Sequence, residues 1–517
     1  MRNLVSRITK ITMKSVLLFC CLFSSTIFSQ DKTKDERPNF IFIIADDMRW
    51  DAMSFVQKQQ GEKARFPWMK TPHLDALAAE SMNFQNAMVA TAVCSPSRAE
   101  YLTGRYGHFN GVASNQIHFP VDNITYATEL KKAGYETGYI GKWHMKNQKE
   151  RPGFDYSASF TGQGHYEDWF FLINGVKTKT EGWIDDVSTD FAIDFINKHR
   201  DKPFALSVGF KTPHIPFIPP ARAKNRFAGE KVGSVPNFYN TAIYRPEVGQ
   251  TEFSDREKVL LKRGMLKTAP REEQPNWALD YFRCISAIDE NIGRLMATLE
   301  QSGLAENTVV IFTSDNGYFM GEHGLGDFRG DKRSAYEESL RVPMLVRYPK
   351  KMPKAATSDE LVLNIDLAPT LLDFAGVEIP KEIQGLSWAP LLTDKNATFR
   401  EGFFYEYFFE NKFAETPTIL AYRTKNKKIV KYPDHQEWIE LYDLEKDPYE
   451  TKNLVKSSKH KKMLKKMEKA YEKEKKAVGY LFPDYAEKPW PDDYEFTRKS
   501  MNQPWLNSNK NKKVNKK

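Results

Sequence analysis

Short, β-rich apolar runs alternate with stretches of helical periodicity, and this alternation constrains the fold more than any other feature of the chain. Such runs are typical of strands buried on both faces of a sheet. Helical patterns lie at 71–81, 188–199 and 282–303. The sequence therefore predicts an α/β fold, with a large, mainly parallel sheet sandwiched by helices. The apolar runs are FIFIIA (40–45), YETGYI (135–140), FALSVGF (204–210), TVVIFTS (308–314) and VPMLVRY (342–348).

The 517 residues are expected to form one large domain and one smaller domain. We predict a main domain over 38–395 and a C-terminal α+β subdomain over 396–500, with a small antiparallel sheet and a helix. The aromatic run at 403–409 is expected to pack against the main domain. The lysine runs that contribute to the net charge of +9 indicate a solvated helix face and a disordered basic tail at 501–517. Basic and aromatic residues do not interleave, so nucleic acid is not an expected partner.

Residues 1–29 have the pattern of an export signal, with a basic leader, an apolar stretch and a small residue, Ser29, at the expected cleavage position. We therefore expect an exported protein, periplasmic or secreted. Lipid anchoring at Cys20 or Cys21 is disfavoured, because bulky residues precede them where small ones are required. The rest of the sequence contains no transmembrane segment.

Removal of the signal leaves Cys94 and Cys284 as the only cysteines, although an exported protein could form disulfides. The fold is therefore expected to depend on its apolar core. A free thiol at Cys94 would be prone to oxidation in that compartment, which is a first indication that residue 94 does not remain a thiol.

Polar and charged residues follow four of the predicted strands. Because ligands bind outside the carboxyl ends of the strands in open α/β sheets, these residues are expected to meet in one cleft. They are Asp46 and Asp47, Lys142 and His144, Lys211 and His214, and Asp315, Asn316 and Gly317.

Four of these side chains offer oxygen ligands: Asp46, Asp47, Asp315 and Asn316. Adjacent buried aspartates repel each other unless a cation offsets their charge. The set suits a hard divalent cation, Ca²⁺ or Mg²⁺. The alternative is that the aspartates cap a helix and that the Asp315 segment forms an ordinary turn.

Five cationic or titratable groups are predicted to surround an anion in the same cleft. Lys142 and His144 are two residues apart, so on an extended chain both point the same way. Arg329 and Arg333 are alternatives to Lys332 on pattern alone. The five groups are Arg98, Lys142, His144, His214 and Lys332.

The stretch CSPSRAEYLTG predicts a helix that begins near Cys94, with Pro96 in its first turn and Gly104 at its end. Cys94 then lies at the positive end of the helix dipole, and Arg98 lies on the same face. On its own this arrangement suggests a cysteine hydrolase with His144 or His214 as the base.

The stretch CSPSRAEYLTGR resembles the signature of the formylglycine-dependent (type I) sulfatases of the alkaline phosphatase superfamily. The wording is closest to iduronate-2-sulfatase-like and bacterial polysaccharide sulfatases. The resemblance extends along most of the mature chain, through PNFIFIIADDMRWD, TPHLDALAAES, GYETGYIGKWH, KTPHIPF, TSDNGYFMGEHG, DKRSAYEESLRVPMLVRYP and ELYDLEKDPYETKNL.

The resemblance implies that a maturation enzyme oxidises Cys94 to 3-oxoalanine (formylglycine). It also implies that Arg98 and Lys142 hold the modified residue, and that Lys332 and His214 bind the sulfate. By the same resemblance, the hydrated aldehyde of residue 94 would attack the sulfur atom of the sulfate. His214 would protonate the leaving alcohol, and His144 would remove the proton from the second hydroxyl of residue 94. The implied Ca²⁺ touches residue 94 and is bound by Asp46, Asp47, Asp315 and Asn316.

The expected substrate is a sulfated oligo- or polysaccharide, for example an algal polysaccharide such as ulvan. Two alternatives stay open: a phosphate or phosphonate ester hydrolase of the same superfamily, and an inactive glycan-binding relative. Candidates for selecting the substrate are His108, His118, His165, Trp169, Tyr244 and Arg245.

Overall fold

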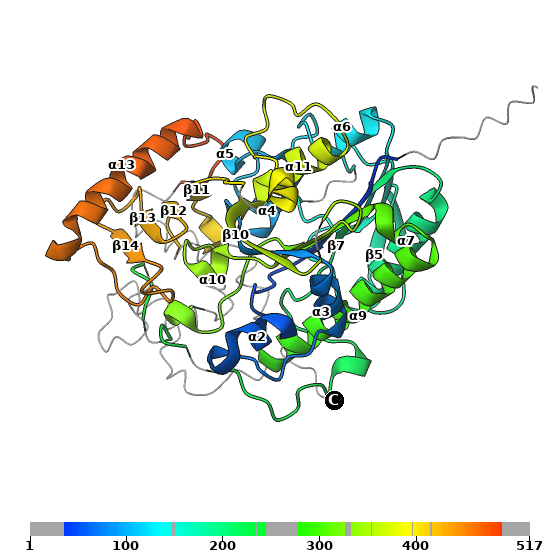
Figure 1. Ribbon diagram of the computed structural model, residues 1–517, viewed down its shortest axis with the longest axis horizontal. Coiled ribbons are helices and arrows are strands. Elements are labelled where there is room, and N and C mark those ends of the chain that lie inside the picture. Colours follow the sequence, from blue (N-terminus) through cyan, green and yellow to red (C-terminus); the bar gives the residue numbers. More distant parts are fainter. Residues whose placement is uncertain are drawn as a thin grey trace, which may run out of the picture. The chain divides into compact units, whose positions relative to one another are not determined.

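A ten-stranded sheet forms the centre of the computed structural model (Figure 1). Its strands are β1 (Asn39–Ala45), β2 (Met82–Met88), β3 (Glu136–Lys142), β4 (Tyr156–Phe160), β5 (Phe170–Ile173), β6 (Val176–Lys179), β7 (Phe204–Gly209), β8 (Thr308–Ser314), β9 (Met344–Arg347) and β10 (Ala356–Leu363). Their order is β10-β2-β9-β8-β1-β7-β3-β4-β5-β6. The central strands β8, β1, β7, β3 and β4 run parallel. The predicted mainly parallel core is confirmed, with β9 antiparallel to both of its neighbours.

The structure describes residues 36–146, 150–233, 235–238, 240–244, 278–325, 332–352, 354–394, 397–413 and 416–488. From Arg37 onward they belong to one unit. The predicted export signal at 1–29 and the basic tail at 501–517 lie outside the described residues. Among the described helices, none combines the length and apolar character needed to cross a membrane.

Helices cover both faces of the sheet. Successive side chains of a strand point to opposite sides, so a strand made of apolar residues presents an apolar surface on each face. Phe40, Phe42 and Ile44 of β1 join one apolar cluster, whereas Ile41 and Ile43 join the other. The first cluster includes residues of α4 (Cys94–Thr103), α6 (Tyr126–Lys132) and α11 (Leu367–Phe374). The second includes residues of α2 (Ser54–Gln60), α3 (Pro72–Ala79), α7 (Ile184–His199) and α9 (Ala278–Gln301). Figure 1 shows α4 and α11 on one side of the sheet and α3 and α9 on the other.

A second, four-stranded antiparallel sheet follows the main sheet in the chain. Its strands are β11 (Gly402–Tyr407), β12 (Ile419–Thr424), β13 (Lys427–Lys431) and β14 (Ile439–Asp443), in that order. The predicted aromatic run at 403–409 is buried in the apolar core, with Phe403, Phe404, Tyr405 and Tyr407 in the same cluster as α4. These rings therefore pack inside the fold, as expected. The remaining α-helices among the described residues are α5 (Gly107–Asn110), α10 (Glu337–Leu340), α12 (Ala389–Thr393) and α13 (Lys461–Ala477).

Candidate active site

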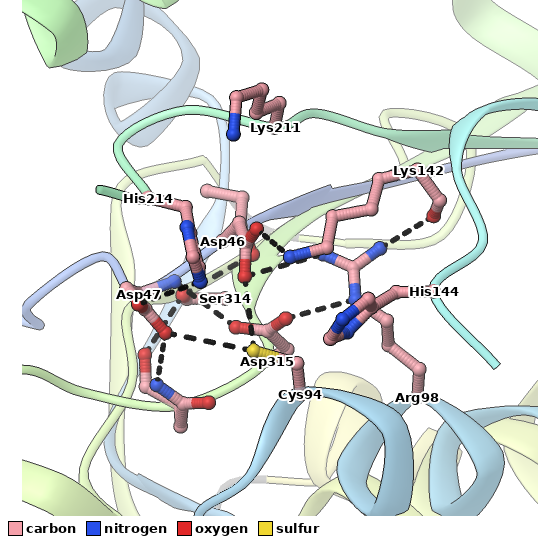
Figure 2. A network of polar contacts seen from close by, with 12 residues as sticks. Asp46, Asp47, Cys94, Arg98, Lys142, His144, Lys211, His214, Ser314 and Asp315 are labelled. Atoms are coloured by element: carbon pink, nitrogen blue, oxygen red, sulfur yellow. Dashed lines mark hydrogen bonds and ion pairs between the residues drawn. The ribbon is translucent and has the colours of Figure 1, made fainter. Parts of the chain in front are cut away.

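The predicted polar residues meet at the carboxyl ends of four adjacent strands (Figure 2). Asp46 and Asp47 follow β1, Asp315 and Asn316 follow β8, and Lys142 ends β3. His214 follows β7, between cis peptide bonds at Thr212–Pro213 and Ile215–Pro216. Because β8, β1, β7 and β3 are consecutive in the sheet, side chains from distant parts of the sequence come together in one site.

The acidic side chains form a buried cluster that also includes Cys94. The Asp47 backbone N–H donates to Asp315 Oδ1 at 3.0 Å, and Asn316 Nδ2 donates to Asp47 Oδ1 at 2.7 Å. Asp47 has a left-handed backbone, with φ 67°. One side-chain ligand atom from each of Asp46, Asp47, Cys94 and Asp315 lies within 4.8 Å of the others. The strained Asp47 backbone thus positions its carboxylate toward the other ligands.

Two observations show that this cluster fits a divalent cation. Asp47 Oδ2 and Asn316 Oδ1 are buried and have no hydrogen-bond partner. Burial, together with the neighbouring Asp46 carboxylate, raises the pKa of Asp315 to about 7, because three carboxylates do not readily ionise side by side. A bound cation would give Asp47 Oδ2 and Asn316 Oδ1 a partner, and it would stabilise the ionised form of Asp315.

Three buried cationic side chains surround the carboxylates. Lys142 Nζ pairs with Asp46, and Lys332 Nζ pairs with Asp47. Arg98 Nε donates to Asp315 Oδ2 at 2.8 Å, and its Nη1 donates to the Lys142 carbonyl at 2.7 Å. Burial alone would raise the pKa of Asp46, but the charges around it, Lys142 first, hold it well below its ordinary value. The predicted Arg98, Lys142 and Lys332 are thus all present at the site. Of the two alternatives to Lys332, Arg333 pairs with Glu410 and Arg329 lies outside the described residues.

Cys94 is the first residue of α4, as the sequence predicts, and all ten residues of this helix are buried. Gly104 ends the helix with φ 65°, and its N–H donates to the Glu100 carbonyl. Cys94 Sγ lies 3.3 Å from Asp46 Oδ1 and 2.9 Å from Lys332 Nζ. Burial and the Asp46 carboxylate raise the pKa of the thiol well above its ordinary value. An unmodified Cys94 would therefore be a poor thiolate nucleophile, which argues against a cysteine hydrolase.

The two predicted histidines lie on different sides of the cluster (Figure 2). His214 Nδ1 lies 2.6 Å from the Ile215 carbonyl, which fixes the proton on Nδ1, and Nε2 lies 3.8 Å from Asp47 Oδ2. Burial and Lys142 lower the pKa of His214 to about 3. His144 has φ 61°, so the expectation that it continues an extended chain from Lys142 was wrong. The Ser95 hydroxyl donates to the His144 carbonyl at 2.7 Å, which holds this turn beside α4.

Sequence reasoning missed two groups at the site and did not include a third, Lys211, in the predicted ring. Gln163 Oε1 accepts a hydrogen bond from Lys142 Nζ at 2.5 Å, and the Tyr166 hydroxyl donates to the His214 carbonyl. Lys211 Nζ is buried without a hydrogen-bond partner, 4.6 Å from the centre of the Tyr166 ring, and Figure 2 shows it directed toward the cluster. The position of Lys211 directly after β7 was a sequence signal for a place at the site. The sequence around Gln163 and Tyr166 gave no such signal.

The candidate substrate-selecting residues have separate environments. His108 is buried against Glu406, with Nδ1 2.6 Å from Oε2, and Tyr244 is buried beside Tyr432, so both pack within the fold. His118 and His165 are exposed, and His165 stacks on the partly exposed ring of Trp169. Arg245 lies outside the described residues.

Residues 38–377 match the family model described as Sulfatase. The chain is a member of the sulfatase family. Residues 321–477 match a second family model, described as N-sulphoglucosamine sulphohydrolase, C-terminal. The predictions of the family and of the enzyme class are confirmed.

Similar sulfatases match over nearly the whole chain. An N-acetylglucosamine-6-O-sulfatase of Bacteroides thetaiotaomicron is 32% identical, over 91% of this chain and 92% of that protein. An ulvan-active sulfatase of Formosa agariphila is 30% identical, over 88% of this chain and 86% of that protein. A solved structure of a protein in complex with its substrate, D-glucosamine-2-N,6-O-disulfate, has a TM-score of 0.75 and 31% identity, and the match covers 87% of this sulfatase and all of that chain.

Proposed function

We propose that this sulfatase is exported and Ca²⁺-dependent, and that it hydrolyses a sulfate ester of a polysaccharide or its oligosaccharides through formylglycine at position 94. The position of Cys94 carries the proposal, because Sγ lies between the Asp46 carboxylate and the Lys332 ammonium. The leader at 1–29 supports export. Maturation of Cys94 requires a formylglycine-generating enzyme as a partner.

Asp46, Asp47, Asp315 and Asn316 would hold the Ca²⁺. A divalent cation there supplies Lewis-acid polarisation of the sulfate oxygens. The unpartnered Asp47 Oδ2 and Asn316 Oδ1 support this set, since buried oxygens without a partner are costly. An all-oxygen set favours Ca²⁺ over softer metals.

Arg98 and Lys142 fix the geometry around residue 94. The Arg98 guanidinium bonds both the Asp315 carboxylate and the Lys142 carbonyl, so it joins α4 to the ends of β8 and β3. Lys332, 2.9 Å from the reacting position, is placed to stabilise negative charge on the sulfate during transfer. Preorganised charges of this kind are usually the largest catalytic contribution.

His214 is suited to proton transfer to the leaving alcohol. In the unliganded site its imidazole is neutral, with Nε2 directed at the cluster. A sulfate anion beside the ring raises its pKa, which allows Nε2 to take up a proton and deliver it to the departing oxygen. His144, on the opposite side, is the group that we assign to proton removal from residue 94.

The relatives named above support two substrate candidates. A 6-O-sulfated amino sugar comes first, because the N-acetylglucosamine-6-O-sulfatase and the glucosamine disulfate complex both match across most of the chain. Ulvan oligosaccharides come second, supported by the ulvan-active relative.

The test is the mass of the peptide that contains residue 94, combined with sulfate release, on protein from a host that has the maturation enzyme. We expect loss of the thiol and gain of an aldehyde or its hydrate, with release of sulfate from one of the two substrates and little phosphate release from the matching phosphate esters. Cys94→Ala should abolish turnover. Cys284→Ala, which removes the other buried cysteine, is the matched control and should retain it. Active protein with an unmodified Cys94 would refute the proposal.

A further inference from the structure

The segment 163–169, between β4 and β5, is tied to the active site at several points. Gln163 bonds Lys142 Nζ, and the Tyr166 hydroxyl bonds the carbonyl of His214. The Tyr166 ring also faces the buried ammonium of Lys211. The segment therefore contacts the last residue of β3 and groups that follow β7, so it lies against the site.

Two aromatic rings of this segment are stacked on each other at the surface, and Trp169 also packs against the apolar core. The rings of His165 and Trp169 lie 3.8 Å apart between centres, with an angle of 19° between their planes. His165 is exposed and Trp169 is partly exposed. Since consecutive Cα atoms are about 3.8 Å apart, the His165 backbone is within about 8 Å of that of Gln163. The His165 backbone thus lies beside that of Gln163, the group that contacts Lys142.

The backbone that carries the pair is held in place. The Trp169 carbonyl accepts hydrogen bonds from the Thr180 N–H at 2.9 Å and from its hydroxyl at 2.8 Å. Asp168 Oδ1 accepts from the Gly182 N–H at 2.8 Å, and the Asp168 N–H donates to the Gly182 carbonyl. Fixed backbone of this kind presents the rings in one orientation, which lowers the entropic cost of binding a ligand.

We propose that His165 and Trp169 form a saccharide subsite, in which the ring stack contacts the apolar face of a sugar adjacent to the one that carries the scissile sulfate. The inference rests on the proposed function. Exposed aromatic faces bind flat apolar surfaces, and a pyranose ring offers such a face while its hydroxyl groups stay in water. Exposed Glu167 and Asp168 flank the stack, so we expect the bound sugar ring to carry no sulfate of its own.

A second stack in the chain provides a matched control. His435 and Trp438 also lie 3.8 Å apart between ring centres, at 16°, and both rings are partly exposed. Trp438 packs against Tyr432, which follows β13 of the four-stranded sheet. The two stacks have the same chemistry, but the His165 stack belongs to the segment that contacts Lys142 and His214.

The experiment compares Trp169→Ala with Trp438→Ala on a sulfated oligosaccharide that the wild type accepts and on 4-nitrophenyl sulfate. For Trp169→Ala we expect KM for the oligosaccharide to rise about tenfold. Its kcat, and kcat/KM for the aryl sulfate, should stay within about twofold. Trp169→Phe should restore most of the affinity, and Trp438→Ala should change neither substrate.

Equal losses on both substrates would show that the segment only supports Lys142 and His214, and would overturn the proposal. An unchanged KM for the oligosaccharide would do the same. If Trp169→Ala does not fold, as judged by thermal melting, His165→Ala carries the test and should raise KM for the oligosaccharide, with Trp169→Phe as the variant that retains the affinity. If the wild type releases no sulfate at all, the proposed function fails. Calorimetric titration of the wild type and Trp169→Ala with the oligosaccharide then decides the subsite separately: weaker binding to the variant supports it, and equal or absent binding refutes it.

Discussion

Replacement of Glu100 by glutamine should stabilise the protein at neutral pH. Glu100 is on α4, six residues after Cys94, and is fully buried. Oε1 accepts from the Thr91 hydroxyl at 2.6 Å, and Oε2 accepts from Asn364 Nδ2 at 2.6 Å. Burial, with a smaller effect from Glu406, raises the pKa of Glu100 from 4.5 to about 8. A glutamine carbonyl can accept from Asn364, and its amide can donate to the Thr91 hydroxyl, so the substitution keeps these contacts without the titration.

The magnitude follows from the two pKa values. Above pH 4.5 the unfolded chain loses the proton while the native state keeps it, so stability falls as pH rises from 4.5 to 8. Since pH 7 lies about 2.5 units above 4.5, the free energy of unfolding is about 3 kcal/mol lower at pH 7 than at pH 4.5. Above pH 8 the loss levels off near about 5 kcal/mol. Glu100→Gln removes this loss. Its advantage over the wild type should therefore grow from near zero at pH 4.5 to about 3 kcal/mol at pH 7.

The assay is urea unfolding at pH 5, 7 and 8.5 on chains with unmodified Cys94, so that maturation does not contribute. Glu437→Gln, at an exposed position outside this cluster, is the matched control. A stability difference between Glu100→Gln and the wild type that does not change with pH would refute the reasoning. So would a variant that is less stable than the wild type at pH 8.5.

Three further predictions concern the metal, a buried lysine and a buried ion pair. Chelation by EDTA should abolish sulfate release and lower the melting temperature, because Asp47 and Asn316 would again hold buried oxygens without partners. Addition of Ca²⁺, but not of Mg²⁺, should restore both. Activity retained after EDTA would contradict this. Lys211→Met should lower kcat/KM for the sulfate ester about tenfold or more, because a charge beside the anion is lost. It should also raise the melting temperature, because burial disfavours the charged lysine and lowers its pKa to about 8. Unchanged kinetics would exclude a role of Lys211 in binding. Arg400→Met should destabilise the fold by about 3 kcal/mol in urea unfolding, since it leaves the buried Asp366 carboxylate without its cation; a loss below 1 kcal/mol would show that Asp366 does not depend on this pair.

Among the central strands, β1 (NFIFIIA) and β8 (TVVIFTS) were predictable because most of their residues are apolar and β-branched or aromatic. β7 (FALSVG) is mostly apolar, whereas in β3 (ETGYIGK) the signal is weaker and comes from Tyr139 and Ile140. The four central strands that carry the site were all found within two residues of their observed ends, and the sites of helices α3, α4, α7 and α9 were also found. The outer strands were not found. β2 (MNFQNAM) has no β-branched residue, and β6 (VKTK) is short and mostly exposed, so neither has the pattern of a buried strand. Their pairing depends on neighbours that are distant in the sequence.

The same distinction applies to the site. Residues directly after a buried strand, such as Asp46 and Asp315, were predictable because the strand end fixes where they lie. Gln163 and Tyr166 belong to an irregular segment, whose path is decided by contacts with Lys142 and His214 and not by a local pattern. The left-handed backbone of His144 was also missed, since only the surrounding contacts determine it.

The burial of α4 restricts when residue 94 can be modified. Every residue from Cys94 to Thr103 is buried in the folded chain, so the proposed maturation enzyme would have to act while this stretch is still unfolded. The proposed oxidation would therefore compete with folding, and a chain that folded first would keep an inert thiol. The fraction of active protein would then depend on the relative rates of synthesis, maturation and folding, and a purified but immature protein would have to be unfolded before it could be activated.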